Sequence, residues 1–129
     1  MNTINRKRLV EVLELPGCTG TRNSGAGSYC ALGKLVLLIG DQEAVKFEWE
    51  NREEVIKLAK MNNYSRFHES LAGHGNDYNF PYAVPHGKPI KPGNKQWLRH
   101  LAATVRAIKL AYRAGKLKLT KDAKEYLGL

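Results

Sequence analysis

The longest apolar run of the chain covers residues 31–39 and predicts its central element. Only Gly33 and Lys34 interrupt this run, so both sides of the element should be buried. Ser28 can cap a helix here by accepting a backbone hydrogen bond, and Gly40 stands where a C-terminal cap is expected. We therefore expect a central core helix. A buried strand over the second half of the run is the alternative, because periodicity does not separate short apolar runs.

Helical spacing of apolar residues and suitable capping residues predict five further helices. These cover residues 4–13, 52–61, 65–72, 95–114 and 120–126. Thr3 would cap the first of them, and Pro16-Gly17 would end it. Asn51, with Glu54 three residues later, would form a capping box at the start of the second.

The segment 44–50 (AVKFEWE) alternates between apolar and polar residues. Val45, Phe47 and Trp49 would share one side, as in a half-buried strand. A helix that starts at Asp41 is the competing interpretation, although it would place Phe47 away from the other two apolar residues. We expect one short strand or hairpin here.

The helix over 95–114 is the best defined of the predicted helices, with Asn94 as its cap and Gly115 at its end. Its large apolar residues fall within one arc of about 100°. They are Trp97, Leu98, Leu101, Val105, Ile108 and Tyr112. On the opposite side lies a basic stripe that consists of Lys95, Arg99, Arg106, Lys109 and Arg113. The stripe contains no acidic residue, as expected of a helix that faces phosphates.

Together these elements predict a single compact domain over residues 1–129 that is mainly α, with an α+β fold left open. The apolar helix should be central, and the long amphipathic helix should pack on it. No apolar run approaches about 18 residues, so we expect no membrane span. The N-terminus lacks the apolar region of a secretory signal. With only two cysteines, Cys18 and Cys30, we expect a cytoplasmic protein with reduced thiols.

The charge of the chain indicates the kind of partner. The 129 residues include 21 Lys and Arg against 12 Asp and Glu, which gives a formal net charge of +9. Such a balance favours polyanionic partners, namely nucleic acid, a nucleotide or an acidic protein surface. Solubility alone is the competing explanation.

Two loops would add contacts to such a partner. Residues 17–28 contain four glycines and lead into the central helix, where backbone N–H groups can bind phosphate. Neither the Walker pattern nor the dinucleotide fingerprint is met there, so no cofactor is predicted. Residues 73–94 hold four of the five prolines together with Tyr78, Phe80 and Tyr82. These rings would either stack on bases or anchor the loop on the core.

Cys30 supports an alternative, enzymatic interpretation. A cysteine at a helix N-terminus is a better nucleophile because the helix dipole stabilises its thiolate, as in papain-like hydrolases. His74 or His86 would supply the base, and Asp77 or Asn76 would orient it. A buried structural thiol competes with this interpretation, because Cys30 adjoins the most apolar segment. The sequence has no CxxC or HxxxH pair, so no metal site is predicted.

Residues 29–35 (YCALGKL) resemble the aromatic-Cys-Ala-Leu-Gly-x-Leu helix start of small bacterial and phage proteins of unknown function. Those proteins also carry an Asn-Asp pair before a last helix, and Asn76-Asp77 and the helix over 95–114 follow in that order here. Lys34 stands where those proteins tend to have a small residue. The resemblance implies an origin in a phage or mobile element and no particular activity.

From the sequence we expect a small basic binding protein, a phage-type accessory or host-modulating factor that engages a polyanionic partner. The contacts should come from the basic stripe and from Tyr78, Phe80 and Tyr82. A binding protein is favoured over an enzyme. The alternatives are a cysteine hydrolase and a protein-only inhibitor of a host enzyme. The sequence leaves open whether two copies form a homo-oligomer by joining their basic stripes.

Overall fold

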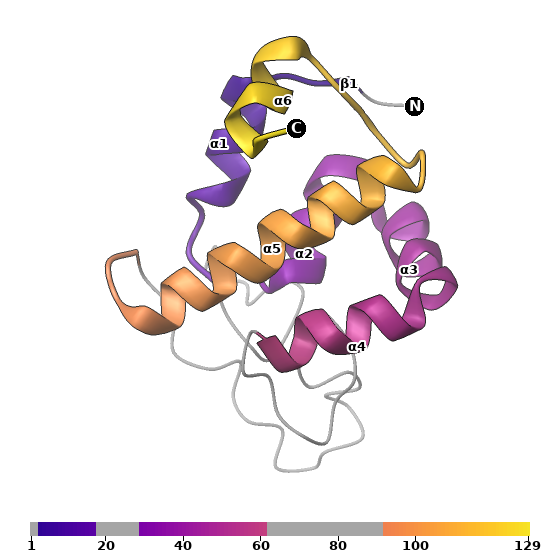
Figure 1. Ribbon diagram of the computed structural model, residues 1–129, viewed down its shortest axis with the longest axis horizontal. Helices are drawn as coiled ribbons and strands as arrows, with labels where there is room; N and C mark the ends of the chain where they lie inside the picture. Colours follow the sequence, from indigo (N-terminus) through magenta and orange to yellow (C-terminus); the bar gives the residue numbers. More distant parts are fainter. Residues whose placement is uncertain (1–2, 18–28, 62–91) are drawn as a thin grey trace.

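A computed structural model describes residues 3–17, 29–61 and 92–129, and these ranges are mainly α-helical (Figure 1). Within them lie two short strands and six helices: β1 (Thr3–Ile4), α1 (Arg6–Leu13), α2 (Ala31–Ile39), α3 (Asp41–Glu50), α4 (Arg52–Met61), α5 (Lys95–Arg113), β2 (Lys118–Leu119) and α6 (Lys121–Leu127). The predicted mainly α class is confirmed. The predicted helix over 65–72 lies outside the described residues.

Helix α2 is the centre of this arrangement, as the apolar run predicts. It packs against α1, α3 and α5, and every residue of its first turn and a half is buried. The N-cap is Cys30 rather than the predicted Ser28: the thiol Sγ accepts a hydrogen bond from the backbone N–H of Gly33 at 3.4 Å. A helix that is apolar on nearly all sides needs covering on all sides, and three neighbouring helices provide this.

A single residue, Gly40, joins α2 to α3. Its backbone N–H donates to the carbonyl of Val36 at 2.8 Å, and its own carbonyl accepts from the N–H of Ala44 at 3.0 Å. The residue therefore closes one helix and opens the next. Its φ of 90° is accessible to glycine and strained for residues with a Cβ, which explains why the chain can turn here within one residue.

The segment 44–50 belongs to helix α3, so the predicted strand is wrong and the competing helix from Asp41 is correct. Ala44, Phe47 and Glu48 are buried, with the i, i+3, i+4 spacing of one helical face. Trp49 is 66% exposed. The alternation that suggested a strand therefore depends on Trp49, whose apolar ring faces solvent and not the core.

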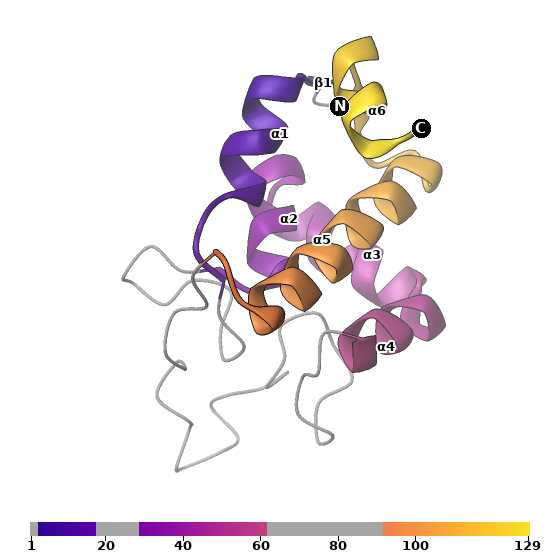
Figure 2. The same cartoon turned by 60° about the vertical axis from the view of Figure 1, so that its left-hand side comes forward.

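The N-terminal segment starts with a strand and not with the predicted helix capped by Thr3. Strand β1 pairs in parallel with β2, with Ile4 opposite Leu119, and the N–H of Thr120 donates to the carbonyl of Ile4 at 3.1 Å. Helix α1 begins afterwards with Asn5 as its cap. The strand pair thereby places α1 beside α6 at one end of the molecule (Figures 1 and 2).

The bounds of α4, α5 and α6 agree with the sequence to within one residue at each end. Asn94 caps α5 by accepting from the N–H of Trp97 at 2.8 Å, and Thr120 caps α6. The capping box predicted for α4 is replaced by other contacts. The side-chain amide of Asn51 donates to the carbonyl of Phe47 at 3.0 Å, and Glu54 contacts Lys57.

Helix α5 buries a different face from the one that its large apolar residues predict. The buried residues are mostly small: His100, Ala103, Thr104, Ala107, Ile108 and Ala111. This face lies roughly a quarter turn from the apolar arc at about 3.6 residues per turn, and Leu98 of that arc is 57% exposed. Small side chains allow α5 to approach α2 closely, and the larger residues pack on the flanks of the core.

Candidate functional site

The basic stripe of α5 faces away from the core. Lys95, Arg99, Arg106 and Arg113 are exposed and Lys109 is partly buried, because they lie opposite the small residues that contact α2. The 19 residues of α5 include these five cations and no Asp or Glu. The stripe therefore faces solvent, and the buried face of α5 differs from the one that was predicted.

Part of the stripe forms one wall of a groove between α4 and α5, which run side by side (Figures 1 and 2). The groove has a volume of about 400 Å³. From α5 it is lined by Arg106, Lys109, Leu110 and Arg113, and from α4 by Glu54, Lys57 and Leu58. We call this the α4–α5 groove. Lys95 and Arg99 lie earlier on α5 and do not line it.

The α4–α5 groove is positive. Four cationic side chains and one carboxylate line it, and the carboxylate of Glu54 lies 3.5 Å from the ammonium of Lys57 on the same helix. Both of these side chains are exposed, so their pairing is screened and weak. In the part of the chain that the structure describes, Arg106, Lys109 and Arg113 make no ion pair. Within those ranges the three charges are not neutralised by an ion pair.

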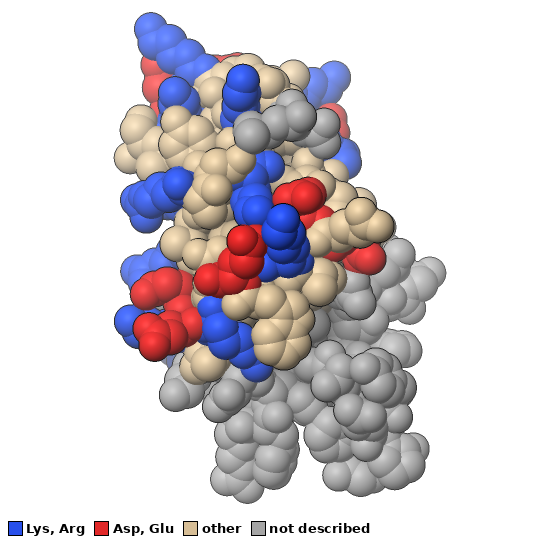
Figure 3. Space-filling model, turned by 90° about the vertical axis from the view of Figure 1, so that its right-hand side faces the viewer, with Lys and Arg blue, Asp and Glu red and all other residues tan. Residues whose placement is uncertain are grey.

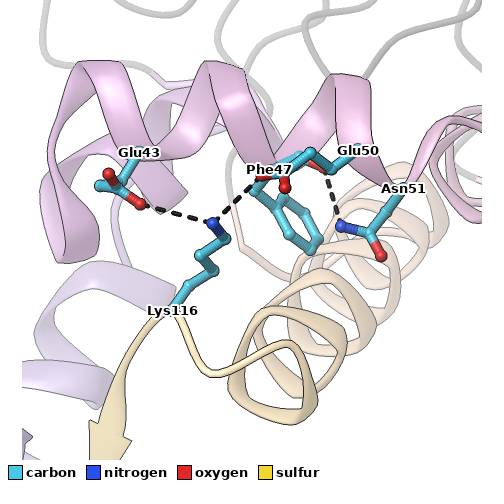
Figure 4. Close-up of polar contacts among 5 residues, drawn as sticks. All are labelled: Glu43, Phe47, Glu50, Asn51 and Lys116. Carbon is cyan, nitrogen blue, oxygen red and sulfur yellow. Dashed lines mark hydrogen bonds and ion pairs between the residues drawn. The ribbon is translucent and has the colours of Figure 1, made fainter.

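Lys116, unlike the three α5 cations of the groove, forms ion pairs with acidic residues in the described ranges. Its ammonium lies 3.1 Å from a carboxylate oxygen of Glu50 and 3.6 Å from one of Glu43, both on α3 (Figure 4). The hydrogen bond to Glu50 raises the pKa of Lys116. This lysine holds the turn after α5 against α3, and its role is structural.

Acidic residues are concentrated on α3 and the start of α4, and one of them, Glu54, also lines the groove. Six of the twelve Asp and Glu residues lie between positions 41 and 54, on α3 and the start of α4. On the side of the molecule where α3 lies, acidic and basic side chains are interspersed (Figure 3), and Arg52 stacks over the exposed ring of Trp49 at 5.0 Å from its centroid. This side has no single sign of charge, unlike the stripe on α5.

A second group of basic nitrogens is buried between α1, α2 and α5. The ammonium of Lys34 donates to the carbonyl of Leu13 at 3.0 Å, and this carbonyl closes α1 and has no partner within its own helix. His100 reaches the same region from α5 and is fully buried. Its ring lies against the backbone of Gly17, where an added Cβ would be 2.7 Å from the ring carbon Cδ2. We call these residues the Lys34–His100 centre.

Burial lowers the pKa of His100 from 6.5 to about 3, and the charge of Lys34 adds to this effect. Within the described ranges neither ring nitrogen has a hydrogen-bond partner. A neutral imidazole with no partner in this part of the structure fills space between helices. The Lys34–His100 centre therefore bears on stability, and a ligand in solvent cannot reach it.

Cys30, the nucleophile of the enzymatic alternative, has no exposed surface. Its thiol caps α2 from inside the core, next to buried Ala31 and Leu32. A substrate would reach the thiol only after this region had opened. The other members of the alternative, His74, His86 and Asp77, lie outside the described residues, and so do the binding candidates Tyr78, Phe80 and Tyr82.

Among the described residues, no group of three or more His, Cys, Asp and Glu side chains is placed to hold a metal ion. No helix in these ranges is long and apolar enough to cross a membrane.

Sequence reasoning found three of the groove residues and missed the rest. Arg106, Lys109 and Arg113 stood out by their helical spacing, whereas the four others become part of a site only because α4 lies beside α5. These are Glu54, Lys57, Leu58 and Leu110. The Lys34–His100 centre is only partly visible in the sequence: Lys34 interrupts an apolar run, and His100 lies between a charged and an apolar residue.

Comparison with protein-family models, with curated proteins and with solved structures finds no match to this chain.

Proposed function

We propose that this chain is a small binding protein that engages nucleic acid through the α4–α5 groove and the neighbouring basic stripe. The observation that supports the proposal most directly is the groove itself. It brings four cations from two helices together, and three of them have no ion pair within the described ranges. Phosphate groups at close spacing are the ligands that such an arrangement attracts most strongly.

Two features favour nucleic acid over an acidic protein surface. The cations follow one another along α5 from Lys95 to Arg113, a length of about 27 Å at 1.5 Å per residue. A row of this length matches a polymer with regularly repeated charges. Leu98, which belongs to the apolar arc of the same helix, is also exposed and offers an apolar contact to a base or a sugar.

The proposal is tested by binding of fluorescein-labelled single-stranded DNA, double-stranded DNA and RNA at 50 and 200 mM salt. The test variant is Arg106→Glu/Lys109→Glu, which reverses two cations in the groove. The matched control is Lys118→Glu/Lys121→Glu, which makes the same change in net charge at exposed positions away from the groove.

We expect the groove variant to lose at least about tenfold in affinity and the control to lose much less. Three phosphate contacts would give a log–log salt slope of about −2 on a single strand. Equal losses in both variants would mean that net charge alone attracts the nucleic acid. No binding at 50 mM salt would contradict the proposal and would favour a protein partner.

The biological setting is a further part of the proposal and rests on the sequence resemblance at residues 29–35. That resemblance implies an origin in a phage or mobile element, and we propose that the chain is a cytoplasmic accessory or host-modulating factor of that origin. A protein-only inhibitor of a host enzyme is the rival. A pull-down that recovers one host enzyme, together with unchanged binding in the groove variant, would support the rival.

A further inference from the structure

The two walls of the α4–α5 groove differ in chemistry. The α5 wall carries Arg106, Lys109 and Arg113, and the α4 wall carries Glu54 beside Lys57. Each helix also contributes one apolar side chain to the lining, Leu58 from α4, which is mostly buried, and Leu110 from α5. A ligand that fills the groove would therefore meet cations on α5, a carboxylate and an ammonium on α4, and apolar surface from both helices.

A nucleotide unit carries a group that suits each of these kinds of side chain. Its phosphate is anionic, its sugar and base faces are largely apolar, and the edge of its base carries donors and acceptors. The groove volume of about 400 Å³ falls within the 300 to 1,000 Å³ that small-ligand sites usually occupy. A groove of this size accommodates a unit of one strand, whereas a duplex is much wider and keeps its bases stacked inside.

Building on the function proposed above, we propose that the α4–α5 groove binds single-stranded nucleic acid and prefers cytosine over thymine. The phosphates lie on the α5 wall. The face of a base covers Leu58 and Leu110. The amino group donates to the carboxylate of Glu54, an acceptor that suits the N4 amino group of cytosine.

Glu54 is the residue that determines specificity in this arrangement. Its carboxylate repels phosphate, so it weakens binding of any strand that offers it no donor. Thymine has a carbonyl oxygen at the position of the cytosine amino group and offers Glu54 only its single ring N–H as a donor. The ammonium of Lys57, 3.5 Å from Glu54, offers a donor to a base carbonyl at the same edge.

The test compares oligo(dC), oligo(dT) and a mixed-sequence duplex of equal length, by fluorescence anisotropy at 50 mM salt. The variants are Glu54→Gln, Leu110→Ala and the groove variant Arg106→Glu/Lys109→Glu. Glu54 is exposed, so Glu54→Gln should fold normally. Circular dichroism checks Leu110→Ala, which removes part of the apolar surface of the groove.

We expect the wild type to prefer oligo(dC) over oligo(dT) by roughly three- to tenfold, as expected of one hydrogen bond of ordinary net strength at an exposed position. Glu54→Gln should strengthen oligo(dT) binding and reduce the preference. Leu110→Ala should weaken both single strands and leave duplex binding unchanged.

The outcomes separate this inference from the function on which it rests. If duplex and single strands bind equally and all depend on Arg106 and Lys109, the proposed function stands and the strand selectivity is wrong. If the oligo(dC) preference persists in Glu54→Gln, the role of Glu54 is wrong. If none of the three ligands binds, the proposed function itself fails.

Discussion

Helix α5 carries basic nitrogens on two opposite sides, and the two groups differ in their exposure to water and in their contacts. In the α4–α5 groove, Arg106, Lys109 and Arg113 retain contact with water and have no ion pair in the described ranges. On the other side, His100 is fully buried near Lys34, whose ammonium holds the end of α1. The groove cations cost little folding free energy because water still solvates them. Lys34 and His100 lose their hydration on folding, and contacts inside the protein must offset that loss.

The difference shows how charge can be assigned to binding or to stability from the structure alone. Exposed cations without partners can bind an anion with no change in the fold. Buried basic groups cannot meet a ligand, but they make the folded state sensitive to pH and to small changes in packing. Substitutions on the two sides of α5 should therefore affect different measurements.

The largest expected effect is acid destabilisation through His100. The folded chain keeps this side chain neutral down to about pH 3, whereas the unfolded chain binds a proton below about pH 6.5. Stability contributed by the neutral ring is therefore present above pH 6.5 and is lost as the pH falls toward 3. The linkage predicts a loss of about 2 kcal/mol at pH 5 and about 3 kcal/mol at pH 4, measured by urea unfolding.

His100→Leu isolates this contribution from the carboxylates that also titrate. Leucine has a similar volume and removes no hydrogen bond that the described ranges contain. The variant should be about as stable as the wild type at pH 7 and should lose about 3 kcal/mol less than the wild type between pH 7 and pH 4. An identical loss in both proteins would show that His100 is not the group that titrates.

The next effect in size concerns the contact between Gly17 and His100. Gly17→Ala would place a Cβ 2.7 Å from Cδ2 and 2.8 Å from Nε2 of the buried ring, so the ring or the backbone must move. Overpacking of this kind costs about 1–3 kcal/mol in unfolding free energy. The effect should nearly vanish in a His100→Ala background, because the ring that causes the clash is absent. Additive effects of the two substitutions would contradict the contact.

The sequence predicted helices well where local signals and packing agree. Asn94 and Gly115 bounded α5, and the apolar run identified α2 as central. The failures came where packing overrode the local pattern. The exposed Trp49 gave α3 the alternation of a strand, and the two-residue strands β1 and β2 are too short to leave a periodic signal.

The buried face of α5 could not be predicted because burial followed close approach and not side-chain size. A helix packs with its small residues where its neighbour is near, and the position of α2 is not encoded in the spacing of α5 alone. The candidate site has the same limit. Its three α5 cations were visible as a stripe, whereas Glu54 and Lys57 joined them only through the packing of α4 on α5.

The smallest expected effect is a difference in melting temperature between variants of one groove cation and of one cation that forms ion pairs. Arg106→Gln should leave the melting temperature unchanged, because an exposed side chain without an ion pair in the described ranges contributes little to stability. Lys116→Gln should lower it by a few degrees at low salt, since Lys116 links the turn after α5 to Glu43 and Glu50 on α3 (Figure 4). Salt screens such links, so the difference between the two variants should shrink at 1 M NaCl. Equal melting temperatures at low salt would mean that the link to α3 does not stabilise the fold. A lower melting temperature for Arg106→Gln would mean that the groove cations contribute to the stability of the folded chain.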